Sequence, residues 1–489
     1  MSTIEVAIIG VGFGGLCAAV RLRAAGVASL VVLERSGEVG GTWRDNTYPG
    51  CACDVPSHLY SLSFEPNRRW TRPYSQQPEI QAYLRRVVQQ YGLDAVIRFG
   101  HEVSALRWDA SAQHWQIELA GQPMLQARHV IVATGPLNKP LLPNVPGLDA
   151  FDGPAFHTSQ WRHDVDLRGK RIAVVGTGAS AVQVVPEIAP HAAHLTVFQR
   201  TPGWVLPRRD RPYGPLRRWL YAHVPGLQTL VRWRIYWFNE WIGMGFLGSA
   251  RMQALLRRLA LQHLRRQVKD AALRTALTPD FNPGCKRLLF SNTWFRALQQ
   301  PNVSLVTQAV ARVTPQGVVG SDGTLHPCDV IIWGTGFRAT EFITPLRVYG
   351  EQGEELSERW RAQPAATRLG ITVAGFPNLF MLVGPNTGLG HNSIIFMIEA
   401  QVYYIVDALR SLRRRGQTLL RLRPEAQANS YAATQQKMKT TVWSSGCHSW
   451  YQNADGRIDT LWPGFTWEYW RQTRRFDPAH YEGAEGAPR

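Results

Sequence analysis

The chain has 489 residues, which is enough for two or three domains with sizeable cores. Its hydrophobic content is 45%, as in ordinary globular proteins, and no uncharged apolar run approaches the ~20 residues that span a bilayer. The formal net charge of +18 comes almost entirely from arginines dispersed along the chain, so without a readable nucleic-acid module we expect no nucleic-acid partner.

The first element along the chain is a strand followed by a glycine-rich turn. The apolar run Val6–Ile9 leads into a fingerprint whose glycines permit a tight strand-to-helix turn and a close approach to a pyrophosphate. These glycines are Gly10, Gly12 and Gly15. A second apolar run over residues 29–33 ends at Glu34, from which a carboxylate can bind the ribose hydroxyls of an adenosine. The segment predicts an adenine-dinucleotide site.

Short strands and a linker come next. Residues 96–108, 115–119 and 130–133 carry apolar or alternating runs, which predict strands of a small sheet. Residues 140–146 are rich in proline and mark a linker to a second unit.

The second unit begins with another glycine fingerprint. The apolar run over residues 172–175 leads into Gly176 and Gly178, and Ala181 stands where the third glycine is usual. The following run, residues 195–199, ends without an acid. It continues into Arg200, whose guanidinium can bind a ribose 2′-phosphate, so this site favours NADPH over NADH. We also expect Ser180 and Thr201 to contact this cofactor. Two nucleotide sites in one chain indicate a redox enzyme.

Residues 213–275 change character, because aromatic residues and leucines alternate with arginines at helical spacing. We expect a helical insertion that covers a cleft. The mix of aromatic and basic residues leaves open a weak contact with a membrane surface.

The last elements return the chain to its beginning. Strands are predicted at residues 303–306 and 330–333, and a buried strand within residues 378–386 leads to a helix over residues 394–410. The predicted fold class is α/β, with two Rossmann-like domains, the second inserted in the first, and a helical insertion.

The cysteines and histidines point to neither disulfides nor metal. The six cysteines are scattered without a disulfide framework, so we expect reduced thiols and a cytoplasmic location. His191 and His194 have no accompanying cluster of acids or cysteines, and we expect no metal site.

A rarer pattern lies between the two fingerprints and carries a family resemblance. It comprises Phe151, Gly153, His157 and Trp161 at the spacing F-x-G-x-x-x-H-x-x-x-W. Together with the two fingerprints, it resembles the signature of the class B flavoprotein monooxygenases, and within them the type I Baeyer–Villiger monooxygenases. The resemblance runs from Ile4 to about Tyr481.

The resemblance implies FAD and NADPH as cofactors and assigns further residues. It places Thr42 and Trp43 beside the flavin, Asn386 in a flavin-side loop, Lys286 on the 2′-phosphate and Trp450 at the NADP ribose. The cofactor-binding set also includes Asp54, Tyr60 and Val103. With these cofactors the domains are an FAD-binding domain over 1–145 and 341–489, an NADPH-binding domain over 146–212 and 276–340, and the insertion over 213–275.

The resemblance also implies an activity. An enzyme of this family inserts one oxygen atom of O2 next to a ketone carbonyl, giving an ester or lactone through a C4a-peroxyflavin. Arg287 would stabilise the negative charge of this peroxyflavin, and Asp54 would orient Arg287. These two residues are the predicted catalytic pair. The aromatic residues Trp204, Trp294 and Phe295 suggest an apolar pocket for a ketone or thioether.

Three alternatives remain at this point. The first is a sister enzyme that oxygenates sulfides or amines through a hydroperoxyflavin, which needs no anion-stabilising arginine. The second is a disulfide reductase, which would need a Cys-x-x-Cys pair, whereas Cys51 and Cys53 have the wrong spacing. The third is a non-catalytic protein that senses nucleotides. Neither the particular substrate nor the oligomeric state follows from the residues.

Overall fold

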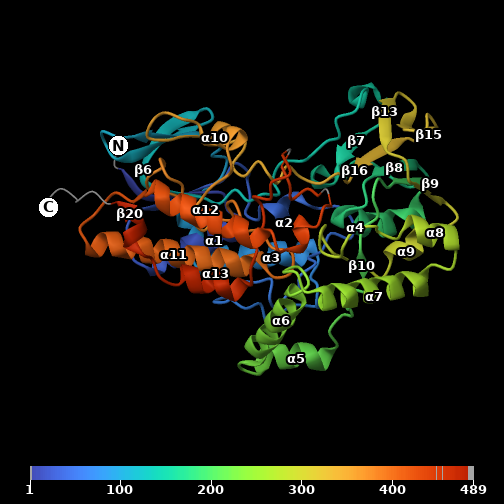
Figure 1. Cartoon of the computed structure of the whole chain (residues 1–489), viewed down its shortest axis with the longest axis horizontal. Coiled ribbons are helices and arrows are strands. Elements are labelled where there is room, and N and C mark those ends of the chain that lie inside the picture. Colours follow the sequence, from blue (N-terminus) through green and yellow to red (C-terminus); the bar gives the residue numbers. More distant parts are fainter. Residues whose placement is uncertain (1–2, 448, 454, 483–489) are drawn as a thin grey trace.

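Two nucleotide-binding folds lie side by side in the computed structural model, which describes residues 3–447, 449–453 and 455–482 (Figure 1). The first contains an eight-stranded sheet whose parallel centre is β6-β1-β2-β3, with β18 also paired to β6. Its strands are β1 (Ile4–Ile9), β2 (Leu30–Leu33), β3 (Ile97–Arg98), β4 (Val103–Asp109), β5 (His114–Leu119), β6 (Gln122–Val132), β17 (Arg347–Tyr349) and β18 (Leu379–Met381).

The second fold contains a five-stranded, fully parallel sheet in the order β12-β9-β8-β16-β7. Its strands are β7 (Ala155–His157), β8 (Arg171–Val175), β9 (His194–Phe198), β12 (Val303–Val306) and β16 (Val330–Trp333). Because strands of the first sheet both precede and follow it in the chain, the second fold is inserted in the first. This confirms the predicted fold class.

Smaller sheets and the helices complete the structure. The small sheets pair β10 (Val205–Leu206) with β11 (Leu289–Phe290), β19 (Arg421–Leu422) with β20 (Tyr481–Glu482), and β13 (Val310–Thr314) with β14 (Gly317–Gly320) and β15 (Leu325–Pro327). The helices outside the insertion are α1 (Phe13–Ala24), α2 (Thr42–Asp45), α3 (Gln77–Gln90), α4 (Ala179–Ile188), α9 (Trp294–Ala297), α10 (Leu356–Ala362), α11 (Ile394–Arg414), α12 (Pro424–Met438) and α13 (Thr466–Thr473).

The insertion is helical, as was predicted from apolar residues that alternate with arginines at helical spacing. Its helices are α5 (Pro215–His223), α6 (Leu227–Gly243), α7 (Ala250–Gln267) and α8 (Ala271–Ala276). In Figure 1, α5 and the adjoining part of α6, in green, extend below the two nucleotide folds. No helix in the described ranges is both long and apolar enough to cross a bilayer.

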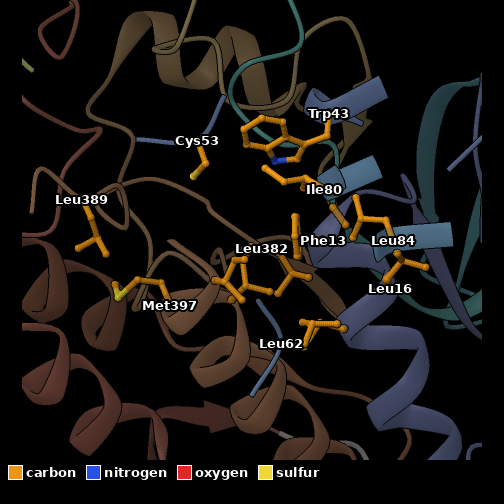
Figure 2. Close-up of a cluster of buried hydrophobic side chains, with 14 of the residues drawn as sticks. Phe13, Leu16, Trp43, Cys53, Leu62, Ile80, Leu84, Leu382, Leu389 and Met397 are labelled. Carbon is orange, nitrogen blue, oxygen red and sulfur yellow. The ribbon is translucent and has the colours of Figure 1, made fainter. Parts of the chain in front are cut away.

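A continuous hydrophobic core packs against the helix that follows the first fingerprint. Phe13 and Leu16 of α1 pack with Ile80 and Leu84 of α3 and with Leu382, which follows β18 (Figure 2). Trp43 borders the same cluster. Central strand β1 is buried over its last four residues, and its apolar run reflects a parallel strand covered on both faces. The packing fixes the strand-to-helix turn that carries the first fingerprint.

Two of the predicted elements need correction. The strand expected over residues 96–108 is two strands, β3 and β4, because the chain turns at Gly100 with φ +68°. The strand expected within residues 378–386 is only β18, since Asn378, Val383 and Asn386 have positive φ angles that end the extended conformation.

Candidate active site between the two nucleotide folds

Both glycine fingerprints open onto one cavity of about 1430 Å³. Gly10 and Gly12 line it from the first fold, and Gly176 and Gly178 line it from the second. Residues of the insertion, including Phe238 on α6, complete the lining. Two dinucleotides bound at these loops would therefore share one cavity.

The glycines of the two loops have matched environments. A Cβ on Gly10 would lie 2.8 Å from the carbonyl oxygen of Ala133, and one on Gly176 would lie 2.4 Å from that of Gly334. Both glycines have positive φ, so a larger residue would be strained and would also clash. The tight turn expected at both positions is thus explained by contact with a neighbouring strand end.

The second glycine of each loop leaves space over a helix N-terminus. A Cβ on Gly12 would meet no protein atom closer than 3.9 Å, and one on Gly178 would meet none within 4 Å. Each glycine precedes the first residue of a helix, α1 or α4, whose amides can bind an anion. Both loops therefore have the shape and the donors that a pyrophosphate requires.

Glu34 lies at the end of β2, where its carboxylate accepts hydrogen bonds from the amides of Val11 and Ser36, both 3.0 Å long. Arg44 also binds it, with 2.9 Å between Nη1 and Oε1. Arg44, which was not predicted as a site residue, also lines the cavity. The acid is thereby fixed beside the first fingerprint, where ribose hydroxyls can bind it.

Two cations mark the second nucleotide loop. Arg200 and Lys286 both line the cavity. Burial lowers the pKa of Lys286, and the nearby charge of Arg200 lowers it further, while Asp280 partly opposes the shift. Two cations held this close form a favourable site for a dianionic phosphate.

Arg287 and Asp54 form an ion pair at the edge of the cavity. Nη2 lies 2.6 Å and Nε 2.8 Å from Oδ2 of Asp54, so the guanidinium donates twice to one carboxylate oxygen. The Asp54 carboxylate raises the pKa of Arg287 above its ordinary value. About a third of the Arg287 side chain (32%) remains exposed, and the residue lines the cavity. A permanent positive charge therefore faces the space between the two loops.

Other contacts hold the first fold and the second together at the site. Gln183 of α4 accepts a hydrogen bond from the Tyr48 hydroxyl at 3.0 Å and donates to the Ala52 carbonyl at 3.0 Å. Within the first fold, the Trp43 indole donates to the Tyr60 hydroxyl at 3.0 Å. Gln183 was not predicted, because a lone glutamine on a helix carries no spacing signal.

Most of the predicted site residues line this cavity. They are Gly10, Gly12, Glu34, Thr42, Trp43, Asp54, Tyr60, Val103, Gly176, Gly178, Ser180, Arg200, Thr201, Lys286, Arg287 and Trp450. Gly15 is not among them, since a Cβ there would lie 1.9 Å from the Gly10 carbonyl oxygen and the residue serves the turn itself. Asn386 is buried outside the lining, where its amide donates to the carbonyls of Ile458 and Leu461.

His157 of the linking pattern also lies outside the cavity lining. It is buried, and burial lowers its pKa to about 4. Its Nδ1 accepts a hydrogen bond from the Ser159 amide, and its ring packs edge-on against Phe337. Trp161 packs in the same way on Phe156. These contacts therefore hold the segment of residues 151–161 in place where the chain enters the second fold.

The predicted apolar pocket was assigned to the wrong residues. Trp204, Trp294 and Phe295 are each at most 3% exposed and do not line the cavity. They lie in packed core, and the Trp204 indole donates to the Phe281 carbonyl. The insertion contributes apolar lining through Ile235, Phe238, Ile242 and Phe246. His391 and Asn392 also line the cavity and lie against Glu240 of α6.

The prediction of six reduced cysteines is wrong for two of them. Cys285 and Cys447 form a disulfide with 6.3 Å between their Cα atoms. They are 162 residues apart in sequence, and only the tertiary fold brings them together. The bond links the segment of Lys286 and Arg287 to the segment before Trp450. The cytoplasmic location loses the support that six reduced thiols would have given it.

In the described part of the chain, no group of three or more His, Cys, Asp or Glu side chains is placed to hold a metal ion. The two glycine loops suit two nucleotides, and the Arg287 guanidinium adds a fixed positive charge between them. Such a site can bring two redox rings together and stabilise negative charge on a third molecule beside them.

Comparisons with known proteins agree with this arrangement. The family model described as pyridine nucleotide-disulphide oxidoreductase matches residues 7–224. A Baeyer-Villiger monooxygenase of Streptomyces coelicolor is 47% identical over 487 residues, which cover 99% of this chain and 93% of the relative. The structure of an oxidized steroid monooxygenase bound to NADP matches with a TM-score of 0.87 and 29% identity, covering 99% of this chain and 100% of that one. A complex of OTEMO with FAD and NADP matches with a TM-score of 0.87 and 26% identity, over 98% and 99% of the two chains.

Proposed function

Because the chain belongs to the Baeyer–Villiger monooxygenases, we propose that it binds FAD and NADPH and inserts one oxygen atom of O2 next to a ketone carbonyl, giving an ester or lactone. The observation that carries this proposal is the Arg287–Asp54 ion pair, which faces the cavity onto which both nucleotide loops open.

The two nucleotides fit the two loops differently. FAD would lie at the first loop, with its pyrophosphate over Gly12 and its adenosine ribose at Glu34. NADPH would lie at the second, with its pyrophosphate over Gly178 and its 2′-phosphate between Arg200 and Lys286. When bound, NADPH supplies a hydride, and the flavin accepts it and then activates dioxygen.

Arg287 supplies the electrostatic part of the reaction. Its guanidinium stays protonated at every working pH, and its pKa lies above the ordinary value because of Asp54. A fixed positive charge stabilises negative charge on the oxygen that attacks the carbonyl and on the tetrahedral oxyanion that follows. This requirement separates ketone oxygenation from the oxygenation of amines or sulfides, in which the reacting oxygen is electrophilic.

Asp54 acts as a positioning residue. Its Oδ2 accepts both hydrogen bonds from Arg287, which fixes the plane of the guanidinium. Tyr451, buried beside the guanidinium, adds a second neighbour that limits how Arg287 can turn.

The substrate side is apolar where α6 and the following turn line the cavity. Ile235, Phe238, Ile242 and Phe246 supply this surface. An apolar lining beside a single fixed charge suits a ketone whose carbonyl is its only polar group.

A product analysis tests the proposal. The purified, FAD-loaded enzyme receives NADPH, O2 and a panel of ketones, thioethers and amines, and the products are identified by mass spectrometry. We expect esters or lactones from at least one ketone class. Sulfoxides or N-oxides alone would move the enzyme to the sister class, and the absence of any oxygenated product from the panel would contradict ketone oxygenation.

The Arg287→Ala variant separates the two half-reactions. We expect it to bind FAD and to be reduced by NADPH under anaerobic conditions, while ester formation falls by ~10²–10³-fold, the usual cost of one preorganised donor. Arg287→Lys, which keeps the charge but loses the double hydrogen bond to Asp54, is the matched control and should retain part of the activity. Normal ester formation by Arg287→Ala would remove the role assigned to this residue.

A further inference from the structure

Large apolar side chains are exposed along α5 and α6. Six of them are between 47% and 72% exposed: Leu216, Trp219, Leu230, Trp233, Trp237 and Trp241. The last four recur at intervals of three or four residues, so they share one face of α6. Four exposed tryptophans on two adjacent helices, which extend below the two nucleotide folds in Figure 1, mark an interaction surface.

The other faces of α6 are already occupied. One is buried against the body of the protein, where Tyr236 packs on Phe396 and Glu240 accepts hydrogen bonds from Thr466. Another lines the cavity through Ile235 and Ile242. The tryptophan face is therefore neither core nor cavity lining, and it lies on the helix that separates the cavity from the outside.

The charged residues of the insertion that carries this face are almost all basic. Residues 211–269 contain ten arginines and one lysine, whereas Glu240 is their sole acid and is buried. In the described part of the chain, Arg232 alone among these cations forms an ion pair with a carboxylate. Arg218 on α5 and Arg234 on α6 are exposed next to the tryptophans. A partner for this face must accept tryptophan and arginine side chains together.

An anionic lipid surface meets both requirements. Indole rings sit at the boundary between headgroups and acyl chains, and arginines beside them bind lipid phosphates. A second copy of the chain fits poorly, because a face without exposed acids would meet the same arginines on the other copy.

We propose that α5 and the tryptophan face of α6 dock this protein on an anionic bilayer. The inference deepens the proposed function, on which it rests for the substrate: the ketones are lipophilic and reach the cavity past α6 from the membrane. Phe238, which is both exposed and part of the cavity lining, connects the docking face with the cavity.

Vesicle co-sedimentation of the FAD-loaded protein tests the docking without any turnover. The probes are vesicles of phosphatidylcholine alone and of phosphatidylcholine with 30% phosphatidylglycerol as a working composition. We expect binding to the anionic vesicles that weakens as salt increases, and little binding to the neutral ones. Absence of binding to the anionic vesicles would overturn the proposal.

Paired variants locate the surface. We expect Trp233→Ala with Trp237→Ala to lower the partition coefficient at least ~10-fold. Arg218→Glu with Arg234→Glu should lower it by about 25-fold or more, counting roughly fivefold for each cation lost. The matched controls are Leu325→Ala and Arg312→Glu, at exposed positions on β15 and β13 of the small three-stranded sheet outside the insertion. These variants should bind like the wild type. Circular dichroism and Tm confirm that each variant is folded. Equal binding by the tryptophan variant would overturn the proposal.

Light scattering and ketone oxidation distinguish failure of the docking proposal from failure of the proposed function. If light scattering shows a dimer that the tryptophan variant dissociates, a second copy covers this face and the proposal is wrong. If vesicles are bound but no ketone is oxidised, the docking surface stands and the proposed function fails. If both hold, the KM of a long-chain ketone presented in anionic vesicles should rise in the tryptophan variant, while that of a small soluble ketone should not.

Discussion

Lys286 and Arg200 are the residues that we propose distinguish NADPH from NADH, and both line the cavity. Their charges are close enough for Arg200 to lower the pKa of Lys286, to which burial also contributes. We therefore expect the titration of Lys286 to control part of the affinity for the 2′-phosphate of NADPH, a group that NADH lacks.

The preference for NADPH should accordingly depend on pH. Because burial and the charge of Arg200 lower the pKa of Lys286, this residue loses its charge at a lower pH than an ordinary lysine does. We expect the KM for NADPH to rise on the alkaline side while the KM for NADH changes little. Steady-state measurements of flavin reduction with both nucleotides across the pH range check this.

The Lys286→Arg variant is the control for this pH effect, since a guanidinium does not lose its proton. Its KM for NADPH should stay flat toward alkaline pH, and Lys286→Ala should show a high KM throughout. If NADH and NADPH respond equally in all three proteins, the 2′-phosphate does not bind at Lys286.

Single residues were predictable from sequence only where a spacing or a family pattern marked them. Glu34 was predicted as a ribose-binding residue from its sequence separation from the first glycine. Its partner Arg44 could not be predicted, because a side-chain contact across a turn produces no periodic pattern in the sequence. The aromatic residues Trp204 and Phe295 failed as pocket residues, since an apolar ring serves a core as readily as a pocket.

At the scale of elements, α6 depends on one buried acid. Glu240 accepts hydrogen bonds from the Thr466 amide and hydroxyl and from the Asn392 side chain, which tie α6 to the starts of α13 and α11. Burial raises the pKa of Glu240, but His391 beside it and these hydrogen bonds outweigh burial and leave the pKa below its usual value. Glu240 therefore stays ionised and holds the helix that borders the cavity.

The Glu240→Gln variant should loosen α6. An amide nitrogen in place of one carboxylate oxygen turns a donor toward other donors, which leaves buried groups unpaired at a cost of about 1–3 kcal/mol. We expect amide hydrogen exchange in residues 227–243 to speed up by about 5- to 150-fold, with little change in α1. Glu358→Gln, an exposed acid on α10, is the control, and equal exchange in both variants would show that Glu240 does not anchor α6.

The sequence predicted whether a segment is a helix or a strand better than it predicted where that element begins and ends. The helical spacing of residues 213–275 predicted an insertion, and α5 to α8 occupy it. The break between β3 and β4 depends on the left-handed turn at a single residue, Gly100, which the strand-like pattern of residues 96–108 did not reveal. The Cys285–Cys447 disulfide joins segments whose proximity only the fold determines.

The whole molecule brings two nucleotide folds and one insertion around a single cavity. The order of the two fingerprints, with strands of the first sheet returning late in the chain, made the inserted arrangement predictable. The shared cavity was not predictable in detail, because it depends on contacts such as that of Gln183 with Tyr48 and Ala52 across the two folds. The domain boundaries drawn from the sequence stay predictions.

Turnover under ¹⁸O₂ in unlabelled water, followed by mass spectrometry of the ester or lactone, directly measures whether this chain transfers one atom of O2 to a ketone. We expect one ¹⁸O atom in each product molecule, and none when unlabelled O₂ is used in H₂¹⁸O after correction for carbonyl exchange. A product whose new oxygen comes from water would contradict the proposed function.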